Sequence, residues 1–172
     1  MTNPQAEGTW AIDTRDFVER RGVIEAEVGE GALPRFAQDA LAPLASVKVR
    51  VEGVRSPRGK PGLRLRAECS IQLECQRCMR PVTLGLSPSA AFELVDGEDQ
   101  LDAEDDGEWD ALVHSAHLDL LAILEDELLL ALPYAPMHAD CSPTQTGDRI
   151  TRASPFAALA PLKGARASRR MN

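Results

Sequence analysis

The sequence predicts an α+β domain in which an antiparallel sheet carries a long apolar helix. Segments 46–55 and 63–75 alternate apolar and polar residues, which is typical of half-buried strands. Segment 118–133 is the most apolar stretch of the chain. Two pairs of metal-ligand residue types, at 75 and 78 and at 138 and 141, lie on either side of it. We therefore predict a fold that brings these pairs together.

Length and composition limit the class of protein. The 172 residues fit one domain with tails, and we place a single α+β domain at 1–141 and a flexible tail at 142–172. Aromatic residues make up only 4%, so the core must be built from Leu, Val, Ile and Ala. The net charge of −8 argues against a generic polyanion binder, since such proteins usually carry an excess of Lys and Arg.

The amino end and the cysteines indicate the compartment. Residues 1–9 are polar and lack an apolar signal region. No apolar run reaches the roughly 18–20 residues that span a bilayer. Without an export signal, the four cysteines are expected to be reduced thiols or metal ligands rather than disulfides. We expect a cytoplasmic protein with no membrane partner.

The first third of the chain predicts two helices and a strand. Asp13 and Thr14 are good caps for a short helix within 10–21, and Gly22 ends it. Segment 23–28 alternates as a strand. Segment 33–44 has apolar residues at helical spacing and Pro34 near its start, so we predict a helix there.

The middle of the chain predicts a hairpin that leads to the first cysteine pair. Strands near 47–55 and 63–75 flank a turn rich in Gly and Pro at 56–62. Alternation resumes after the cysteines, and we predict a further strand at 81–95. Cys75 and Cys78 therefore lie at a bend between two strands, where their side chains are free to converge.

The last part of the chain predicts a loop, a helix and a tail. Ten acidic residues and no Lys or Arg lie between 93 and 110, and this charge density favours a flexible loop at about 96–110. Asp119 caps a long apolar helix at about 119–131, with residues 125–127 as its solvent-facing stripe. Within the tail, segment 155–163 is an apolar island that we interpret as a short docking segment.

These residues resemble the YceD family of bacterial large ribosomal RNA subunit accumulation proteins. The resemblance covers the chain from about residue 63 onward. It implies a role in the synthesis, processing or accumulation of 23S rRNA, and it implies no known catalytic reaction. The matching pieces are Leu73–Cys78 with Pro81, Leu118–Ala122, Glu125–Pro133, Pro136–His138 with Cys141, and Pro155–Leu159 with Leu162 and Lys163.

Three cysteines and one histidine form a candidate zinc site: Cys75, Cys78, His138 and Cys141. Zinc accepts this ligand set, but 63 positions separate Cys78 from Cys141, so the fold would have to assemble the site. In one alternative, the cysteines are reduced thiols at a turn and in a loose linker. A dithiol redox role is another, although a redox pair usually opens a helix.

Basic residues of the hairpin and the bend are candidate contacts to rRNA phosphates. Nine basic and three acidic residues lie between 48 and 80. The alternative is an ordinary solvated sheet face, and aromatic residues for base stacking are missing from this segment. The candidate RNA-binding residues are Lys48, Arg50, Arg58, Lys60, Arg64, Arg66, Arg77 and Arg80.

We predict a non-enzymatic ribosome-biogenesis factor that contacts 23S rRNA or a precursor particle of the large subunit. The alternative is an adaptor that grips a ribosomal protein or a nuclease through its acidic loop and tail, without touching RNA. An enzyme finds little support: His114 and His117 have no paired nucleophile, and Gly59-Lys60 lacks the rest of a phosphate-binding loop. We expect no cofactor other than zinc.

Overall fold

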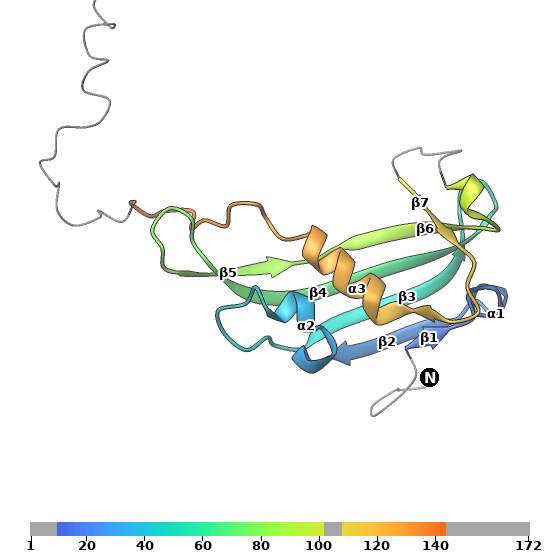
Figure 1. The fold of residues 1–172 in the computed structure, drawn as a ribbon, viewed down its shortest axis with the longest axis horizontal. Coiled ribbons are helices and arrows are strands. Elements are labelled where there is room, and N and C mark those ends of the chain that lie inside the picture. Colours follow the sequence, from blue (N-terminus) through green and yellow to red (C-terminus); the bar gives the residue numbers. More distant parts are fainter. Residues whose placement is uncertain (1–9, 102–107, 144–172) are drawn as a thin grey trace, which may run out of the picture. The chain divides into compact units, whose positions relative to one another are not determined.

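A computed structural model describes residues 10–101 and 108–143 of the chain. The protein is a mixed α+β structure dominated by strands, with few helices (Figure 1). Residues 102–107 of the predicted acidic loop lie outside the described residues, as do residues 144–172 of the predicted tail. The flexible tail and the docking segment at 155–163 therefore stay predictions.

The main sheet has six strands, and five of them follow the order β2-β3-β4-β6-β7. Neighbouring strands are antiparallel except β6 and β7, which are parallel. The prediction of an antiparallel sheet is wrong at this edge, because β6 and β7 run in the same direction. The strands are β2 (Val23–Val28), β3 (Val47–Arg55), β4 (Pro61–Glu74), β5 (Pro81–Leu86), β6 (Ser89–Val95) and β7 (Asp110–Val113).

The long strand β4 changes partner along its length. Its first half pairs with β3 and β6, and its second half, Cys69–Glu74, pairs with β5. The predicted strand at 81–95 is therefore two strands, separated at Ser87-Pro88. Pro88 has no N–H for a ladder, and its carbonyl accepts a hydrogen bond from Ala67 N at 3.0 Å. The β4–β5 ribbon consequently extends beyond β3 and ends in the bend that carries the first cysteine pair (Figure 1).

Alternation along β3 and β4 defines the core face of the sheet. The side chains of predicted inward parity are buried except Cys69, which is only half-buried, and the side chains between them are exposed or half-buried. Burying such residues supplies most of the folding free energy, at about 25 cal/mol per Å² of apolar surface. The buried set is Val47, Val49, Val51, Leu63, Leu65, Ala67, Ile71 and Leu73.

Helix α3 (Leu120–Leu130) has only 11 residues, so the expected long apolar helix is a helix of three turns. Asp119 caps it by accepting hydrogen bonds from the N–H groups of Leu121 and Ala122. Figure 1 shows α3 over one face of the sheet. Its buried residues Leu120, Leu124 and Leu128 belong to the same core cluster as the inward residues of β3 and β4.

The prediction that residues 125–127 of α3 face solvent is wrong for Glu125. Glu125 is buried, and its Oε1 accepts hydrogen bonds from Arg35 N at 2.6 Å and Phe36 N at 3.1 Å. Its Oε2 accepts from Arg35 Nε at 2.6 Å. Asp126 is exposed, as predicted. The carboxylate of Glu125 thus joins α3 to the start of α2 (Pro34–Ala37).

The predicted helix at 33–44 is also wrong. After the 3₁₀ turn η1 (Glu30–Ala32), α2 makes a single helical turn that ends at Ala37. Pro43 cannot donate in a helix, and its ring would clash with the preceding turn. Instead, Leu41 N donates to Gln72 O at 2.8 Å, so this segment runs beside β4. The apolar spacing reflects two buried anchors, Leu33 and Phe36, rather than a continuous helix.

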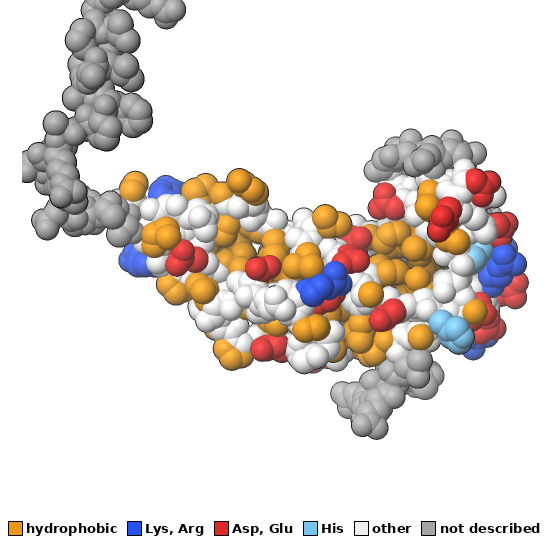
Figure 2. Space-filling model, viewed as in Figure 1, with side chains coloured by type: hydrophobic (Ala, Val, Ile, Leu, Met, Phe, Trp, Pro, Cys, Tyr) orange, Lys and Arg blue, Asp and Glu red, His pale blue; other side chains and the backbone are white. Residues whose placement is uncertain are grey.

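The remaining elements lie at the opposite end of the sheet from the cysteine bend. Helix α1 (Thr14–Glu19) begins at the predicted cap Asp13. Strand β1 (Ala11–Ile12) pairs with β8 (Leu118–Asp119), and η2 (Glu98–Gln100) follows β6. Figure 2 shows charged side chains of both signs at this end. Across the described residues, no helix has the length and apolar character needed to span a bilayer.

Candidate metal centre

The bend between β4 and β5 turns two cysteine side chains inward. Cys75 N donates to Arg80 O at 3.0 Å, and Met79 N donates to Cys75 O at 2.9 Å. Met79 closes the bend with φ 56, in the left-handed region that favours glycine. As a result Cys75 is fully buried and Cys78 is nearly so. A short backbone turn thus places both sulfurs on one side.

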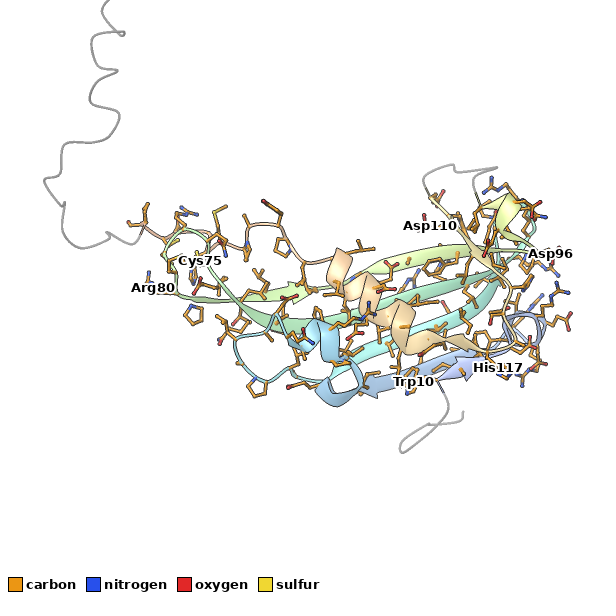
Figure 3. The ribbon with its side chains drawn as sticks, in the orientation of Figure 1. Trp10, Cys75, Arg80, Asp96, Asp110 and His117 are labelled. Carbon is orange, nitrogen blue, oxygen red and sulfur yellow. The ribbon has the colours of Figure 1, made fainter. Side chains whose placement is uncertain are left out.

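The second ligand pair reaches the bend from the segment that follows α3. Pro133 and Pro136 lead the chain out of the helix, and Pro136 O accepts a hydrogen bond from Gln76 N at 2.8 Å. Cys141 packs against the buried cluster of Cys75, Cys78 and Val82. Figure 3 labels Cys75 and Arg80 at this end of the β4–β5 ribbon, far from Asp96 and His117.

The structure brings all four predicted metal ligands together. Their ligand atoms lie within 4.8 Å of one another, with 3.7 Å between Cys75 Sγ and Cys141 Sγ and 3.4 Å between Cys78 Sγ and His138 Nδ1. Tetrahedral zinc with bonds of about 2.3 Å to sulfur would separate two sulfurs by about 3.8 Å. A disulfide needs about 2.05 Å, and all four cysteines are free. The cluster therefore has the spacing of a metal site rather than of a disulfide.

His138 is held in the orientation that a metal ligand needs. Its Nε2 lies 3.0 Å from Pro81 O. A carbonyl only accepts, so Nε2 carries a proton and Nδ1 is the nitrogen left to coordinate a metal. Metal-bound histidines commonly have their second nitrogen fixed in this way by a carbonyl or carboxylate. The backbone carbonyl that performs this role has no signature in the sequence.

The cluster stabilises thiolates on the bend. Burial opposes ionisation of Cys75, but hydrogen bonds from the N–H groups of Cys78, Arg77 and His138 outweigh it and lower the pKa of Cys75 to about 5. Burial likewise opposes ionisation of Cys78, whereas hydrogen bonds from Arg80 lower the pKa of that thiol. The bend is therefore prepared for two negative sulfurs, the form in which cysteine binds metal.

The negative charge of the bend also raises the pKa values of Cys141 and His138. Burial, followed by the two sulfurs of the bend, raises the pKa of Cys141 to about 11. Hydrogen bonding to Cys75 raises the pKa of His138, which burial opposes. Three sulfurs at this separation repel one another when ionised, and a bound cation would relieve the repulsion.

The eight predicted RNA-binding residues do not form one surface. Lys48, Arg50, Arg64 and Arg66 lie on the outward face of β3 and β4, as their parity predicts. On the same face, β2 places Glu25 opposite Arg50 and Glu27 opposite Lys48, and Glu68 lies opposite Lys48 on β4. Arg50 forms ion pairs with Glu25 and Glu52. Acidic residues therefore alternate with the basic ones across the face.

The other four predicted contacts make interactions within the protein. Arg58 and Lys60 form ion pairs with buried Glu93, at 2.9 and 3.7 Å. At the bend, Arg77 donates to two backbone carbonyls, and Arg80 hydrogen-bonds to Cys78. Arg64 of the outer face also has an internal partner, since its guanidinium lies 5.4 Å from the ring centroid of Trp109. Apart from the contact between Arg80 and Cys78, these pairings join distant segments, so strand parity alone could not predict them.

Fold and site together define a strand-dominated α+β protein with a candidate metal site of three cysteines and one histidine. Residues 63–163 match the family described as "Large ribosomal RNA subunit accumulation protein YceD". The chain therefore belongs to the YceD family. It is 28% identical over 142 residues to a protein of that name from Haemophilus influenzae, covering 76% of this chain and 82% of the relative. No solved structure matches the chain.

Proposed function

We propose that this protein is a non-enzymatic factor that promotes the accumulation of 23S rRNA in the cytoplasm. The observation that carries the proposal is the family match over residues 63–163, which includes most of β4, the cysteine bend, α3 and the second ligand pair. Deleting the gene should lower the ratio of 23S to 16S rRNA, and the wild-type chain should restore it. An unchanged ratio in the deletion strain would contradict the proposal.

The metal site would serve this role as a structural crosslink. Its ligands come from the end of the β4–β5 ribbon and from the segment after α3, so one ion would join two parts of the chain that are about 60 positions apart. Two thiolate-forming cysteines on a tight bend, a third cysteine and an oriented histidine fit zinc better than Mg²⁺ or Ca²⁺, which prefer oxygen ligands. A closed shell of four protein ligands is typical of structural zinc and leaves no open position for catalysis.

Metal analysis of protein purified without chelator tests the crosslink. We expect about one zinc per chain, and no zinc in a Cys75→Ser/Cys78→Ser double variant. Cys69→Ser is the matched control, because Cys69 is a half-buried strand cysteine outside the cluster. Wild-type protein without zinc would refute the metal site while leaving the rRNA role open.

Direct contact with rRNA would use the outward face of β2, β3 and β4. A hollow of about 670 Å³ lies there, lined by residues of the three strands and by Ser87–Ser89. Lys48 and Arg66 line it. Within the part of the chain that the structure describes, neither side chain forms an ion pair, whereas Arg50 forms two. They are therefore the two cations best placed to reach phosphates.

Charge reversal at Lys48 and Arg66 tests this contact better than reversal of Arg58 or Lys60. Replacing either of those two would remove an ion pair of buried Glu93 and could disturb the fold. A Lys48→Glu/Arg66→Glu variant should lose crosslinking to 23S rRNA in cells. Arg20→Glu, at the exposed C-cap of α1, is the charge-reversal control and should crosslink like wild type. Equal crosslinking of all three proteins would refute contact through this face.

The adaptor alternative has one specific observation in its favour. The outward face of β2, β3 and β4 carries Glu25, Glu27, Glu52 and Glu68 beside its four basic residues, so it has little net attraction for a polyanion. A mixed-charge face suits a polypeptide partner such as a ribosomal protein. Crosslinks to polypeptide alone, with none to RNA, would favour this alternative.

A further inference from the structure

Arg77 stands between the two halves of the metal site and joins them through its side chain. It is one of the two residues inside the Cys75–Cys78 pair. Its Nη2 donates to His138 O at 2.9 Å, and its Nη1 donates to Cys141 O at 3.1 Å. Both acceptors are the carbonyls of the second pair of ligands. The guanidinium of one ligand segment therefore spans the backbone of the other.

We propose that Arg77 is a positioning residue for the metal centre, which holds the His138–Cys141 segment against the bend before the ion binds. The proposal rests on the proposed zinc site. It assigns Arg77 to the interior of the site rather than to RNA, the role predicted from its charge.

The geometry explains why arginine is needed at this position. The two carbonyls are three residues apart in the chain, and a planar guanidinium presents two N–H groups to two acceptors at once. A lysine ammonium is a compact charge on a flexible stem and has no fixed fork. Arg77 is half-buried, so its two bonds are partly shielded from water. Holding the carbonyls fixes the backbone from which both ligand side chains project.

The net charge of the zinc-loaded site gives Arg77 a second way to favour metal binding. Three thiolates and one divalent zinc ion sum to one negative charge. Arg77 lies beside this charge through its contact with Cys141, and Arg80 lies beside it through Cys78. A neighbouring guanidinium stabilises the loaded site electrostatically. Arg80 contacts a sulfur and Arg77 contacts carbonyls, so the two effects are separable by substitution.

Competition of the full-length chain against a chromogenic zinc chelator tests the proposal. Partners of metal ligands typically change metal affinity by about 10- to 100-fold when they are replaced. We expect a loss of this size for Arg77→Gln and an incomplete recovery for Arg77→Lys, which restores the charge without the fork. Arg80→Gln removes the guanidinium that contacts a sulfur instead of the carbonyls, and it should keep the thiolate count that Arg77→Gln lowers. Arg20→Gln, at the exposed C-cap of α1, is the control for charge and should bind zinc like wild type.

Cobalt substitution supplies a readout that a purely structural role would not move. The charge-transfer absorption of bound Co²⁺ reports how many thiolates coordinate it. With Arg77→Gln, limiting Co²⁺ should bind with weaker thiolate absorption per ion, because Cys141 is no longer held in place. Circular dichroism of the variants shows whether each has folded, and Arg77→Lys keeps the test valid if Arg77→Gln has not.

The outcomes separate the positioning role from the site itself. If wild type binds zinc and both Arg77 variants bind it within twofold of wild type, the positioning role is overturned and the metal site stands. If Arg77→Lys equals wild type while Arg77→Gln is weak, charge alone is responsible, and the role of the fork is overturned. If wild type binds no zinc, both the site and the role of Arg77 fail.

Discussion

Replacing Glu125 should destabilise this protein more than any other change to the acidic residues of α3. The carboxylate is buried and accepts three hydrogen bonds, two from backbone N–H groups at the start of α2 and one from Arg35 Nε. In Glu125→Ala both N–H groups lose their partner, at about 1–3 kcal/mol for the buried N–H of Phe36 and about 1 kcal/mol for the part-buried N–H of Arg35. The Arg35 side chain is half exposed and turns to water at little cost. The expected loss in the free energy of unfolding is therefore about 2–4 kcal/mol.

The neighbouring carboxylate provides the control. Asp126 also bonds to Arg35, at 2.8 Å, but both side chains of that pair are at least half exposed. Exposed ion pairs contribute about 0–1 kcal/mol, so Asp126→Ala should cost less than 1 kcal/mol. Urea unfolding of the zinc-saturated proteins measures both values. The reasoning is refuted if the two substitutions cost the same, or if Glu125→Ala costs under about 1 kcal/mol.

The buried carboxylate of Glu125 should also make the free energy of unfolding depend on pH. Burial tends to raise the pKa of Glu125, but the hydrogen bonds from Arg35 and Phe36 lower it below its ordinary value of 4.5. Because the folded pKa is depressed, this stabilisation is present above the unfolded pKa and is lost as the pH falls through the folded pKa. The difference in unfolding free energy between wild type and Glu125→Gln should therefore be constant above about pH 5 and shrink below about pH 4. A difference that grows on acidification would contradict this sign.

Three further predictions concern the backbone and the metal. Met79→Gly should stabilise the protein by up to about 1 kcal/mol, since glycine adopts a positive φ without strain; a lower melting temperature at unchanged zinc content would contradict this. Gly53→Ala should destabilise by about 1–3 kcal/mol, because a Cβ there would lie 2.9 Å from the backbone of Phe17. Gly85→Ala, whose Cβ meets nothing within 4 Å, should be near neutral in the same urea titration. Chelator should lower the melting temperature of wild type and leave a Cys141→Ser variant almost unchanged; equal shifts in both would show that Cys141 is not a ligand.

Local pattern was sufficient for β2, β3 and the helix caps Asp13 and Asp119, and insufficient for the segments at 33–44 and 81–95. The bounds of β2 and β3 follow directly from period-two alternation, because one face of β3 is buried and one face of β2 is at least half-buried. The apolar spacing at 33–44 led to the wrong prediction of a helix. Leu33 and Phe36 are buried by contact with other elements, and Pro43 prevents a continuous helix. Glu125 was misplaced for a related reason. Its partner Arg35 lies 90 positions away, and no local pattern reports that distance.

The sequence predicted the ligands of the metal site but not the contacts that support them. Residue type and spacing suffice to identify Cys75, Cys78, His138 and Cys141, because few residue types bind zinc and the CxxC gap lets two sulfurs converge. The supporting contacts could not be predicted from the sequence. The carbonyl of Pro81 is a backbone atom, and the contacts of Arg77 depend on how the segment after α3 returns to the bend. Basic side chains near a predicted interface are therefore ambiguous until their acceptors are known.

X-ray absorption at the zinc edge of the purified full-length chain tests the central claim most directly. A single shell with three sulfurs at about 2.3 Å and one nitrogen at about 2.0–2.1 Å would match the cluster of three cysteines and one histidine. Loss of one sulfur in Cys141→Ser would show that the segment after α3 completes the site. A shell dominated by oxygen, or protein that carries no zinc, would contradict the crosslink between the β4–β5 bend and that segment.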